Sequence, residues 1–519
     1  MLRNKIYNLL LAGLILWLGS SCLKSKAPGI PEPVRKIIDL SGINRTQFLE
    51  ALVKYENKDD SAKREALFYL IANMGSHYEI SYRLTDSTGK VYTFPLKDYP
   101  DYHTLIKHFR LTEEKHGKLI PQPDTIILDI HSVTAPLLTT TIDSAFYCRE
   151  HPFFNDYAYS YNDFYEYILP YRVANEKPEP FRHFFREKYC TGLFSILPGN
   201  QTDLITLISN IHRMVSNDIK FDKRFEKHFN YPTLSEISET GFGNYRDLAI
   251  YEVKAFRSFG IASTMDYSPY FADSAGGLFW PVVKIDDNSF IPVFRSNIPS
   301  DRFIAPGRIP KVFRREYKDD STTLFRIKKI SEHTPAFLGQ FNYKDVTEEY
   351  IPVSDVLIPL TDTSKYTYLA VFNNGAWHPV HWSLTNYNTE ANFTKMGLNI
   401  VYLPVIIRNK KTIPAGVPFL LQNHNSVRFL SGKSTTSQQQ ITLTQTAPYR
   451  YLKPHRKYNI FIWDNDGWNF YNACLADYRG TIKASVSEKG LYIISEKDFA
   501  DYFTDERPFI ISNKSLLFY

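Results

Sequence analysis

The spacing of apolar residues changes once along this 519-residue chain, and the change limits the folds that the chain can adopt. Before about Lys344, apolar residues recur at intervals of three and four, as on one face of a helix. After that point they alternate with polar residues, as in strands with one buried face. The chain is therefore expected to be an α+β protein, with an α-helical N-terminal region, an α+β core and C-terminal β-sandwich modules.

Three segments outside the core motif carry the helical spacing. Residues 46–53 and 63–74 fit amphipathic helices, and Thr46 stands where the first would be capped. Residues 203–217 place their apolar side chains on one face of a third helix. This third helix is expected to pack behind a helix that starts at Tyr245.

Strand signals fill the C-terminal part of the chain. Residues 366–372 and 377–382 predict a hairpin, because Asn374-Gly375 between them favours a type I′ turn. Further short strands are expected at 399–407, 417–422, 426–430, 440–444, 459–463, 490–495 and 507–512. Two β-sandwich modules account for this number of strands.

The N-terminus has the pattern of a secretion signal. Arg3 and Lys5 precede an apolar run over residues 9–18, which is too short to span a bilayer comfortably. Small residues and then Cys22 follow at once, and they resemble a lipobox, in which the cysteine thiol receives the lipid. The chain is therefore expected to be anchored by Cys22 to a membrane of the bacterial cell envelope, on the outer membrane or facing the periplasm. An ordinary cleavable signal with an incidental cysteine is the alternative.

Composition excludes several classes of function. The formal net charge is only +6, and two of the positive charges lie in the signal segment, so no polybasic surface for nucleic acid is expected. Apart from Cys22, only Cys148, Cys190 and Cys474 are present. Their odd number and wide spacing fit neither a disulfide framework nor a zinc site. No cofactor and no metal ion are expected.

Three short segments form the most informative motif of the chain. Residues 243–249 are Gly-Asn-Tyr-Arg-Asp-Leu-Ala, residues 257–261 are Arg-Ser-Phe-Gly-Ile, and residues 277–280 are Gly-Leu-Phe-Trp. Between the first two, apolar residues follow the helical period, and Gly260 stands where a left-handed helix end is expected. Residues 279–285 and 290–294 predict a strand hairpin around Asp286.

These segments resemble the core of the transglutaminase-like superfamily. Members have Gly-x-Cys-x-Asp-x-Ala at the start of a helix, Arg-Ala-x-Gly-Ile-Pro at its end and Gly-His-x-Trp on a later strand. The resemblance places Tyr245 at the nucleophile position, Asp247 at the following aspartate and Leu278 at the histidine position, and it implies a papain-like α+β core. Neither a phenol nor an isobutyl group can replace a thiolate and its imidazole, so a catalytically inactive core is expected.

Segments that flank the core are similar to one group within this superfamily, the Bacteroidetes-type transglutaminase-like lipoproteins. Residues 63–74 resemble that group's Lys-x-x-Ala-x-Phe-Leu-Ile-x-Asn-Met segment, and residues 168–176 resemble its Ile-Leu-Pro-Tyr-Arg-x-x-x-Glu stretch. Residues 344–350 are similar to its entry into the β modules. The expected division is a signal peptide (1–21), a lipidated tether (22–36), an α-rich region (37–195), a degenerate core (196–335), a β-sandwich module (336–447) and a C-terminal β module (448–519).

Two classes of function follow from this resemblance. In the first, the protein binds or scaffolds a peptide, protein or glycan, and a pocket is expected at Tyr245, Asp247, Leu278 and Trp280. In the second, it is a diverged hydrolase or acyltransferase with a displaced nucleophile such as Cys190, served by His183 or His212. His378 and His381 have the spacing of helical metal ligands, but on a strand they point to opposite faces and predict no shared metal site.

Overall fold

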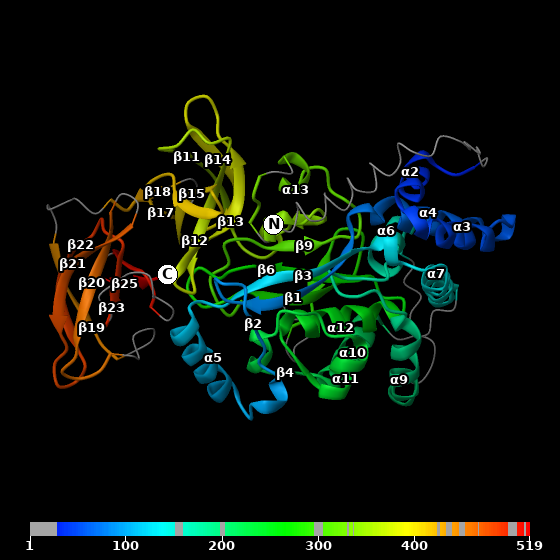
Figure 1. Cartoon of the computed structure of the whole chain (residues 1–519), viewed down its shortest axis with the longest axis horizontal. Coiled ribbons are helices and arrows are strands. Elements are labelled where there is room, and N and C mark those ends of the chain that lie inside the picture. The colour runs from blue at the N-terminus through cyan, green and yellow to red at the C-terminus, as the bar shows by residue number, and fades with distance from the viewer. Residues whose placement is uncertain are drawn as a thin grey trace.

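The computed structural model describes residues 29–150, 159–197, 203–294, 305–329, 332–335, 337–422, 426–431, 438–445, 452–464, 467–496, 506–512 and 515–519. The expected lipid anchor, Cys22, lies outside these residues. Figure 1 shows the N-terminal helices at one end, a mixed core in the middle and β-rich modules above it and at the opposite end. The α+β class expected from the sequence is confirmed.

The N-terminal region combines helices with a small sheet. Its principal helices are α2 (Glu32–Leu40), α3 (Arg45–Lys54), α4 (Ser61–Asn73), α5 (Tyr102–His116) and α7 (Ala135–Glu150). An antiparallel sheet in the order β2-β1-β3 (Val91–Tyr92, Tyr78–Thr85, Ile120–Leu128) lies among them. The sequence did not predict this sheet, because Pro121 and Pro123 weaken the strand signal of β3.

The core is built on one antiparallel sheet. Its strands follow the order β10-β9-β6-β7-β8 (Tyr343–Asp345, Phe313–Arg315, Ser263–Ser268, Leu278–Lys284, Phe290–Pro292). Helix α12 (Tyr245–Ser258) packs on β6 and β7. The predicted hairpin is the β7–β8 pair, in which Lys284 stands opposite Phe290. Gly260 has a φ of +76°, which confirms the predicted left-handed turn after α12.

Two further helices cover α12. They are α9 (Phe181–Ile196) and α10 (Leu204–Asp218), and their apolar faces share one buried cluster with α12, β7 and β8. The expected boundary at residue 195 therefore falls at the end of a helix that packs with the core. The boundary at residue 335 also precedes β10, which completes the core sheet.

The first β module spans residues 353–429 and is a sandwich. One sheet pairs β11 (Val353–Pro359) with β14 (Glu390–Gly397). The other follows the order β13-β12-β15-β17-β18 (Ala376–Leu384, Tyr366–Asn373, Ile400–Arg408, Phe419–Leu421, Val427–Phe429), with β16 (Lys411–Pro414) beside β15.

The larger sheet of the first β module is covered on both faces. One face packs on β11 and β14, and the other contacts the core and the C-terminal strands. Every residue of β12 is therefore buried, which explains why its sequence is almost continuously apolar. Asn374 and Gly375, with φ of 46° and 79°, form the turn that the Asn-Gly pair predicts.

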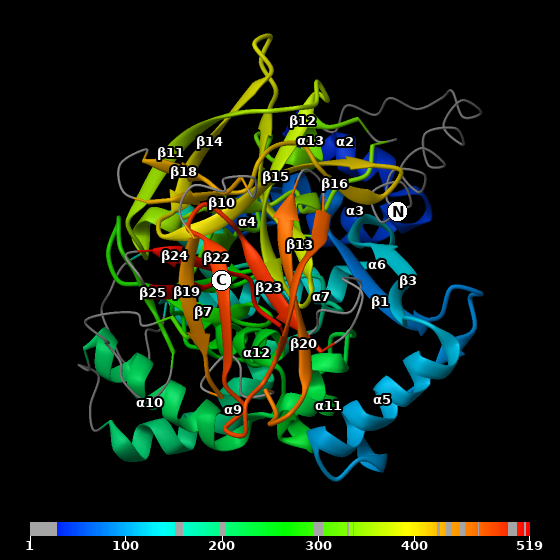
Figure 2. The ribbon, with the colours of Figure 1, turned by 90° about the vertical axis from the view of Figure 1, so that its left-hand side faces the viewer.

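The second β module spans residues 438–518 and is also a sandwich (Figure 2). One sheet follows the order β21-β20-β23-β24-β25 (Gly467–Leu475, Lys457–Asp464, Tyr492–Ser495, Phe509–Ser512, Ser515–Phe518). Strand β19 (Gln438–Leu443) pairs with β22 (Ile482–Ser487) in the opposite sheet. The sequence placed β19 in the first module, but Ile441 and Leu443 pack in the core of the second module. The module boundary therefore precedes residue 438.

Candidate functional site

The motif around Tyr245 forms the start of helix α12. The side chain of Asn244 accepts a hydrogen bond from the backbone N–H of Asp247 at 3.1 Å, and the Asp247 carboxylate accepts one from the Asn244 N–H. Asp247 also pairs with Arg246 at 2.9 Å. Two helix-end donors are satisfied in this way. Asp247 is 2% exposed and organises the helix start.

The ring of Tyr245 is packed among other aromatic rings. It stacks on Phe221, with the ring centroids 4.2 Å apart and the planes 16° apart. The ring of Phe294, which follows β8, lies 6.4 Å away. Tyr245 also packs against the hydrophobic cluster that contains Leu278 and Trp280. The place that the resemblance assigns to a nucleophile therefore holds an aromatic stack.

The remaining residues of the Tyr245 site are enclosed. Leu278, the first residue of β7, is 1% exposed, and Trp280 is fully buried. The indole N–H of Trp280 donates to the hydroxyl of Tyr350 at 3.0 Å. The structure thus brings the motif residues together as a filled cluster. Tyr245, Leu278 and Trp280 supply it with neither a thiol nor an imidazole, which acyl transfer through cysteine requires.

A buried ion pair lies beside this cluster and was not predicted. The Arg314 guanidinium donates to both carboxylate oxygens of Asp266, at 2.9 and 2.8 Å, and also contacts Glu349. The hydroxyl of Tyr350 donates to the same aspartate at 2.7 Å. Burial raises the pKa of Asp266, and Arg314 opposes the rise. Arg314 and Tyr350 both donate to Asp266 of β6, and Arg314 also contacts Glu349. This network therefore ties the 344–350 segment to β6.

The other motif residues hold the N-terminal region on the core. Arg257 donates to the carbonyl oxygen of Arg172 at 2.7 Å and to that of Ser263 at 3.0 Å. Arg172 in turn pairs with the fully buried Asp129. The Glu176 carboxylate accepts the backbone N–H of Val173 at 2.8 Å. These contacts are structural, because buried charges require partners of this kind.

Cys190 lies on α9 and is half-buried. Burial raises the pKa of its thiol, which leaves the unreactive thiol form at neutral pH. The two proposed base residues have other partners: His183 pairs with Glu187 at 3.0 Å, and His212 pairs with Glu252 at 2.6 Å. No imidazole contact to Cys190 is found among the described residues.

A second arrangement with the composition of a hydrolytic triad occurs on α10. Ser216 lies 3.5 Å from the Nε2 atom of His212, whose Nδ1 atom contacts Glu252. The serine and the histidine are one turn apart on the same helix, so the backbone N–H groups around Ser216 are used within α10. They cannot form the oxyanion site that serine hydrolysis needs.

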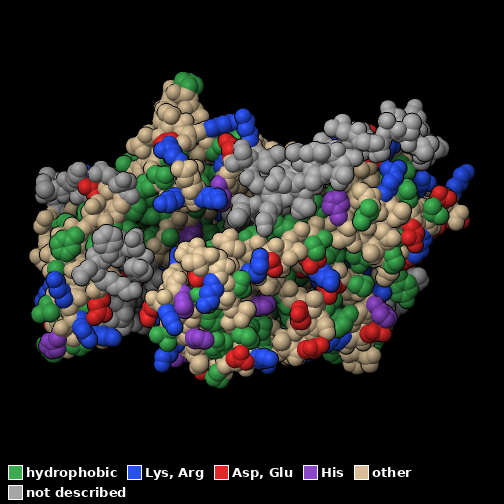
Figure 3. Space-filling model, viewed as in Figure 1, with side chains coloured by type: hydrophobic (Ala, Val, Ile, Leu, Met, Phe, Trp, Pro, Cys, Tyr) green, Lys and Arg blue, Asp and Glu red, His purple; other side chains and the backbone are tan. Residues whose placement is uncertain are grey.

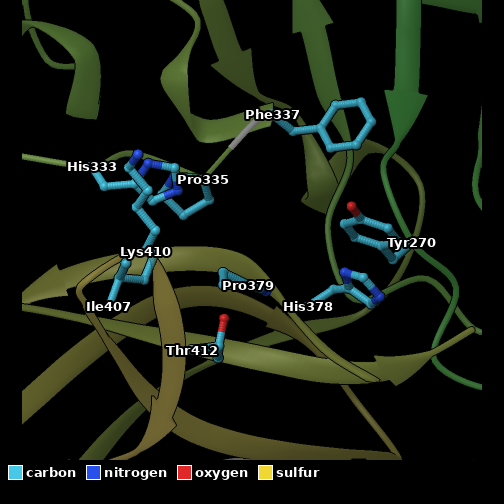
Figure 4. Close-up of a pocket in the computed structure, with 9 residues that line it drawn as sticks. All are labelled: Tyr270, His333, Pro335, Phe337, His378, Pro379, Ile407, Lys410 and Thr412. Atoms are coloured by element: carbon cyan, nitrogen blue, oxygen red, sulfur yellow. The ribbon is translucent and has the colours of Figure 1, made fainter. Parts of the chain in front are cut away.

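A cavity of about 140 Å³ opens between the core and the first β module (Figure 4). The core side supplies Tyr270, His333, Pro335 and Phe337, and the β module supplies His378, Pro379, Ile407, Lys410 and Thr412. In Figure 3, basic and histidine side chains gather where the projecting β module meets the core. The sequence did not predict this site, whose residues come from four separate segments.

Two histidines shape the electrostatics of the cavity. His378 stacks on Tyr270, with the ring centroids 4.4 Å apart. Burial lowers the pKa of His378 to about 4 and also lowers that of His333, while burial raises the pKa of Tyr270 to about 12. His381 instead lies near Phe393, so the two histidines of β13 have different neighbours. No group of residues suited to a metal ion is found in the described part of the chain.

Comparison with protein-family models, with curated proteins and with solved structures finds no match to this chain. Within the described ranges, no helix combines the length and apolar character needed to cross a membrane.

Proposed function

We propose that this chain is a catalytically inactive member of the transglutaminase-like superfamily that binds a peptide, protein or glycan in the bacterial cell envelope. Its expected attachment to the membrane is a lipid on Cys22. One observation carries the proposal: Tyr245, at the position that the resemblance assigns to the nucleophile, stacks on Phe221 at 4.2 Å and packs against the hydrophobic cluster that contains Leu278. Tyr245, Leu278 and Trp280 supply neither the thiolate nor the imidazole base that attack on a carbonyl carbon requires in this superfamily.

The arrangement of the core supports the relationship to the superfamily. The motif residues occupy the start of α12, its C-terminal end and the start of β7, and α12 packs directly on β7. These are the positions that a nucleophile helix and a base-bearing strand require. The helix start also retains its capping interactions, so its geometry does not depend on a catalytic residue.

A diverged enzyme that uses Cys190 is the alternative function. The raised thiol pKa and the separate partners of His183 and His212 give it less support. A cysteine nucleophile is normally activated by a lowered pKa or by an adjacent base.

Reconstruction of the lost pair tests the proposal. Wild-type protein and the Tyr245→Cys/Leu278→His variant are treated with a cysteine-directed electrophile, and labelled peptides are located by mass spectrometry. We expect no labelling within residues 243–249 of the wild type and labelling at position 245 of the variant. The Tyr245→Cys single variant is the matched control, because it supplies the thiol without the imidazole and should react more slowly.

Labelling of the wild type at Cys190, at a rate typical of an activated thiolate, would favour the alternative enzyme. A variant thiol that stays unreactive in folded protein would contradict the inferred relationship between Tyr245 and Leu278.

A further inference from the structure

The cavity between the core and the first β module is lined by one lysine, two histidines, a threonine and a tyrosine, together with apolar side chains. We propose that it binds a carboxylate carried on a short apolar body, either a small carboxylic acid or the C-terminal residue of a peptide. This inference rests on the proposed binding function and specifies what is bound and where. The proposed ligand lies away from the Tyr245 site, where the first β module meets the core. Lys410 reaches this place from the turn between β15 and β16.

The polar groups of the cavity favour an anionic acceptor. Lys410 is the only charged residue among the described lining residues, and none of them is acidic. The Nδ1 atom of His333 and the Nε2 atom of His378 are buried and have no hydrogen-bond partner among the described residues. A carboxylate accepts several hydrogen bonds, so it can satisfy Lys410 together with a donor from the His333 imidazole or from the Thr412 hydroxyl.

The arrangement of these groups leaves space between them. In Figure 4, His333 and Lys410 stand on one side of the cavity, and the stacked Tyr270 and His378 stand on the other. The hydroxyl of Thr412 points up from the floor. A ligand placed between the two sides therefore meets His333 and Lys410 on one side and the Tyr270–His378 stack on the other.

Size and wall composition limit the body of the ligand. The cavity of about 140 Å³ is several times the roughly 30 Å³ that one water occupies in the liquid, but smaller than the roughly 300–1,000 Å³ of drug-sized sites. Pro335, Phe337, Pro379 and Ile407 supply apolar walls. The site therefore suits one small terminal group.

Titration calorimetry with the full-length chain tests this inference. The probes are acetyl-Ala-Val with a free carboxylate, the same peptide as its C-terminal amide, and isobutyrate. The amide is expected to bind at least about ten-fold more weakly than the acid, because a charge-assisted hydrogen bond is lost. Tighter binding of the peptide than of isobutyrate identifies a peptide terminus as the ligand, and the reverse identifies a small acid.

Variants connect binding to the cavity. Lys410→Gln should weaken binding of the acid by about ten-fold or more, and Lys411→Gln, which removes a neighbouring exposed charge outside the cavity, should leave it unchanged. Equal binding of acid and amide, equal effects of the two lysine variants, or no binding of any probe would overturn the inference.

The same experiment separates this inference from the proposed function. Peptide recovered unchanged after binding agrees with both. Binding that depends on Lys410 but is accompanied by conversion of the peptide would retain the site and refute the absence of catalysis.

Discussion

Replacement of Tyr245 and Phe221 by alanine, singly and together, measures how strongly the two rings stabilise the place that the resemblance assigns to a nucleophile. Their centroids lie 4.2 Å apart and their planes differ by 16°. Such a pair contributes about 0.5–1.5 kcal/mol beyond the area that it buries. Both rings are only half-buried, so each single replacement should cost less than the roughly 3–5 kcal/mol of a fully buried ring. We expect a coupling free energy of about 1 kcal/mol between the two positions.

Hydrogen exchange of the α12 amides is the appropriate assay, because a chain with several modules does not unfold in one step. A coupling free energy of about 1 kcal/mol corresponds to a factor of about five. The local opening constant of the double variant should differ by this factor from the value expected if the two single replacements acted independently. Tyr245→Phe is the control, since it keeps the stacked ring and should exchange like the wild type. Strictly additive effects of the two alanine replacements would refute the conclusion that the rings support each other.

Three further predictions concern the ion pair, the pH dependence and the anchor. Arg314→Leu should lower the free energy of unfolding of the core by about 3–5 kcal/mol, because it leaves the Asp266 carboxylate buried without its partner; hydrogen exchange of the β6 amides measures the loss. Burial raises the pKa of the Glu316 carboxyl group from 4.5 to about 7. The raised pKa therefore contributes to the stability of the folded state fully below about pH 4.5, and this contribution is lost as the pH rises through 7. Glu316→Gln should therefore reduce the fall in unfolding temperature between pH 5 and pH 8, and an unchanged fall would contradict this assignment. Radiolabelled palmitate should enter the wild type but not Cys22→Ala, and equal labelling would reduce the anchor to an ordinary secretion signal.

Local patterns predicted the elements that have a regular period. Helix α12 and the hairpin of β12 and β13 carry their signals within a few residues, as capping groups, a helical apolar face and an Asn-Gly turn. Strand β3 was missed because its two prolines resemble a loop. The position of β19 could not be read from its own sequence, since its partner β22 lies far along the chain.

The Tyr245 site and the cavity differ in how much the sequence could reveal. The first consists of short motifs on α12 and β7 whose spacing resembles that of one family, so its residues were identified together. The second combines residues 270, 333, 335, 337, 378, 379, 407, 410 and 412, which only the packing of the first β module on the core brings together. His378, within strand β13, was the one residue of the cavity that its sequence context made conspicuous. Its stacking partner Tyr270 could not be inferred from spacing.

Turnover by the wild-type protein is the most direct test of the absence of catalysis. Full-length protein is incubated with a panel of peptide, amide and ester substrates, with and without an amine acceptor, and the products are measured by mass spectrometry. Cys190→Ala and Ser216→Ala are included, because they remove the two other candidate nucleophiles. We expect no product above the rate of the uncatalysed reaction with any of the three proteins. Product formation by the wild type that disappears in Cys190→Ala or Ser216→Ala would show a displaced nucleophile and contradict the proposed binding function.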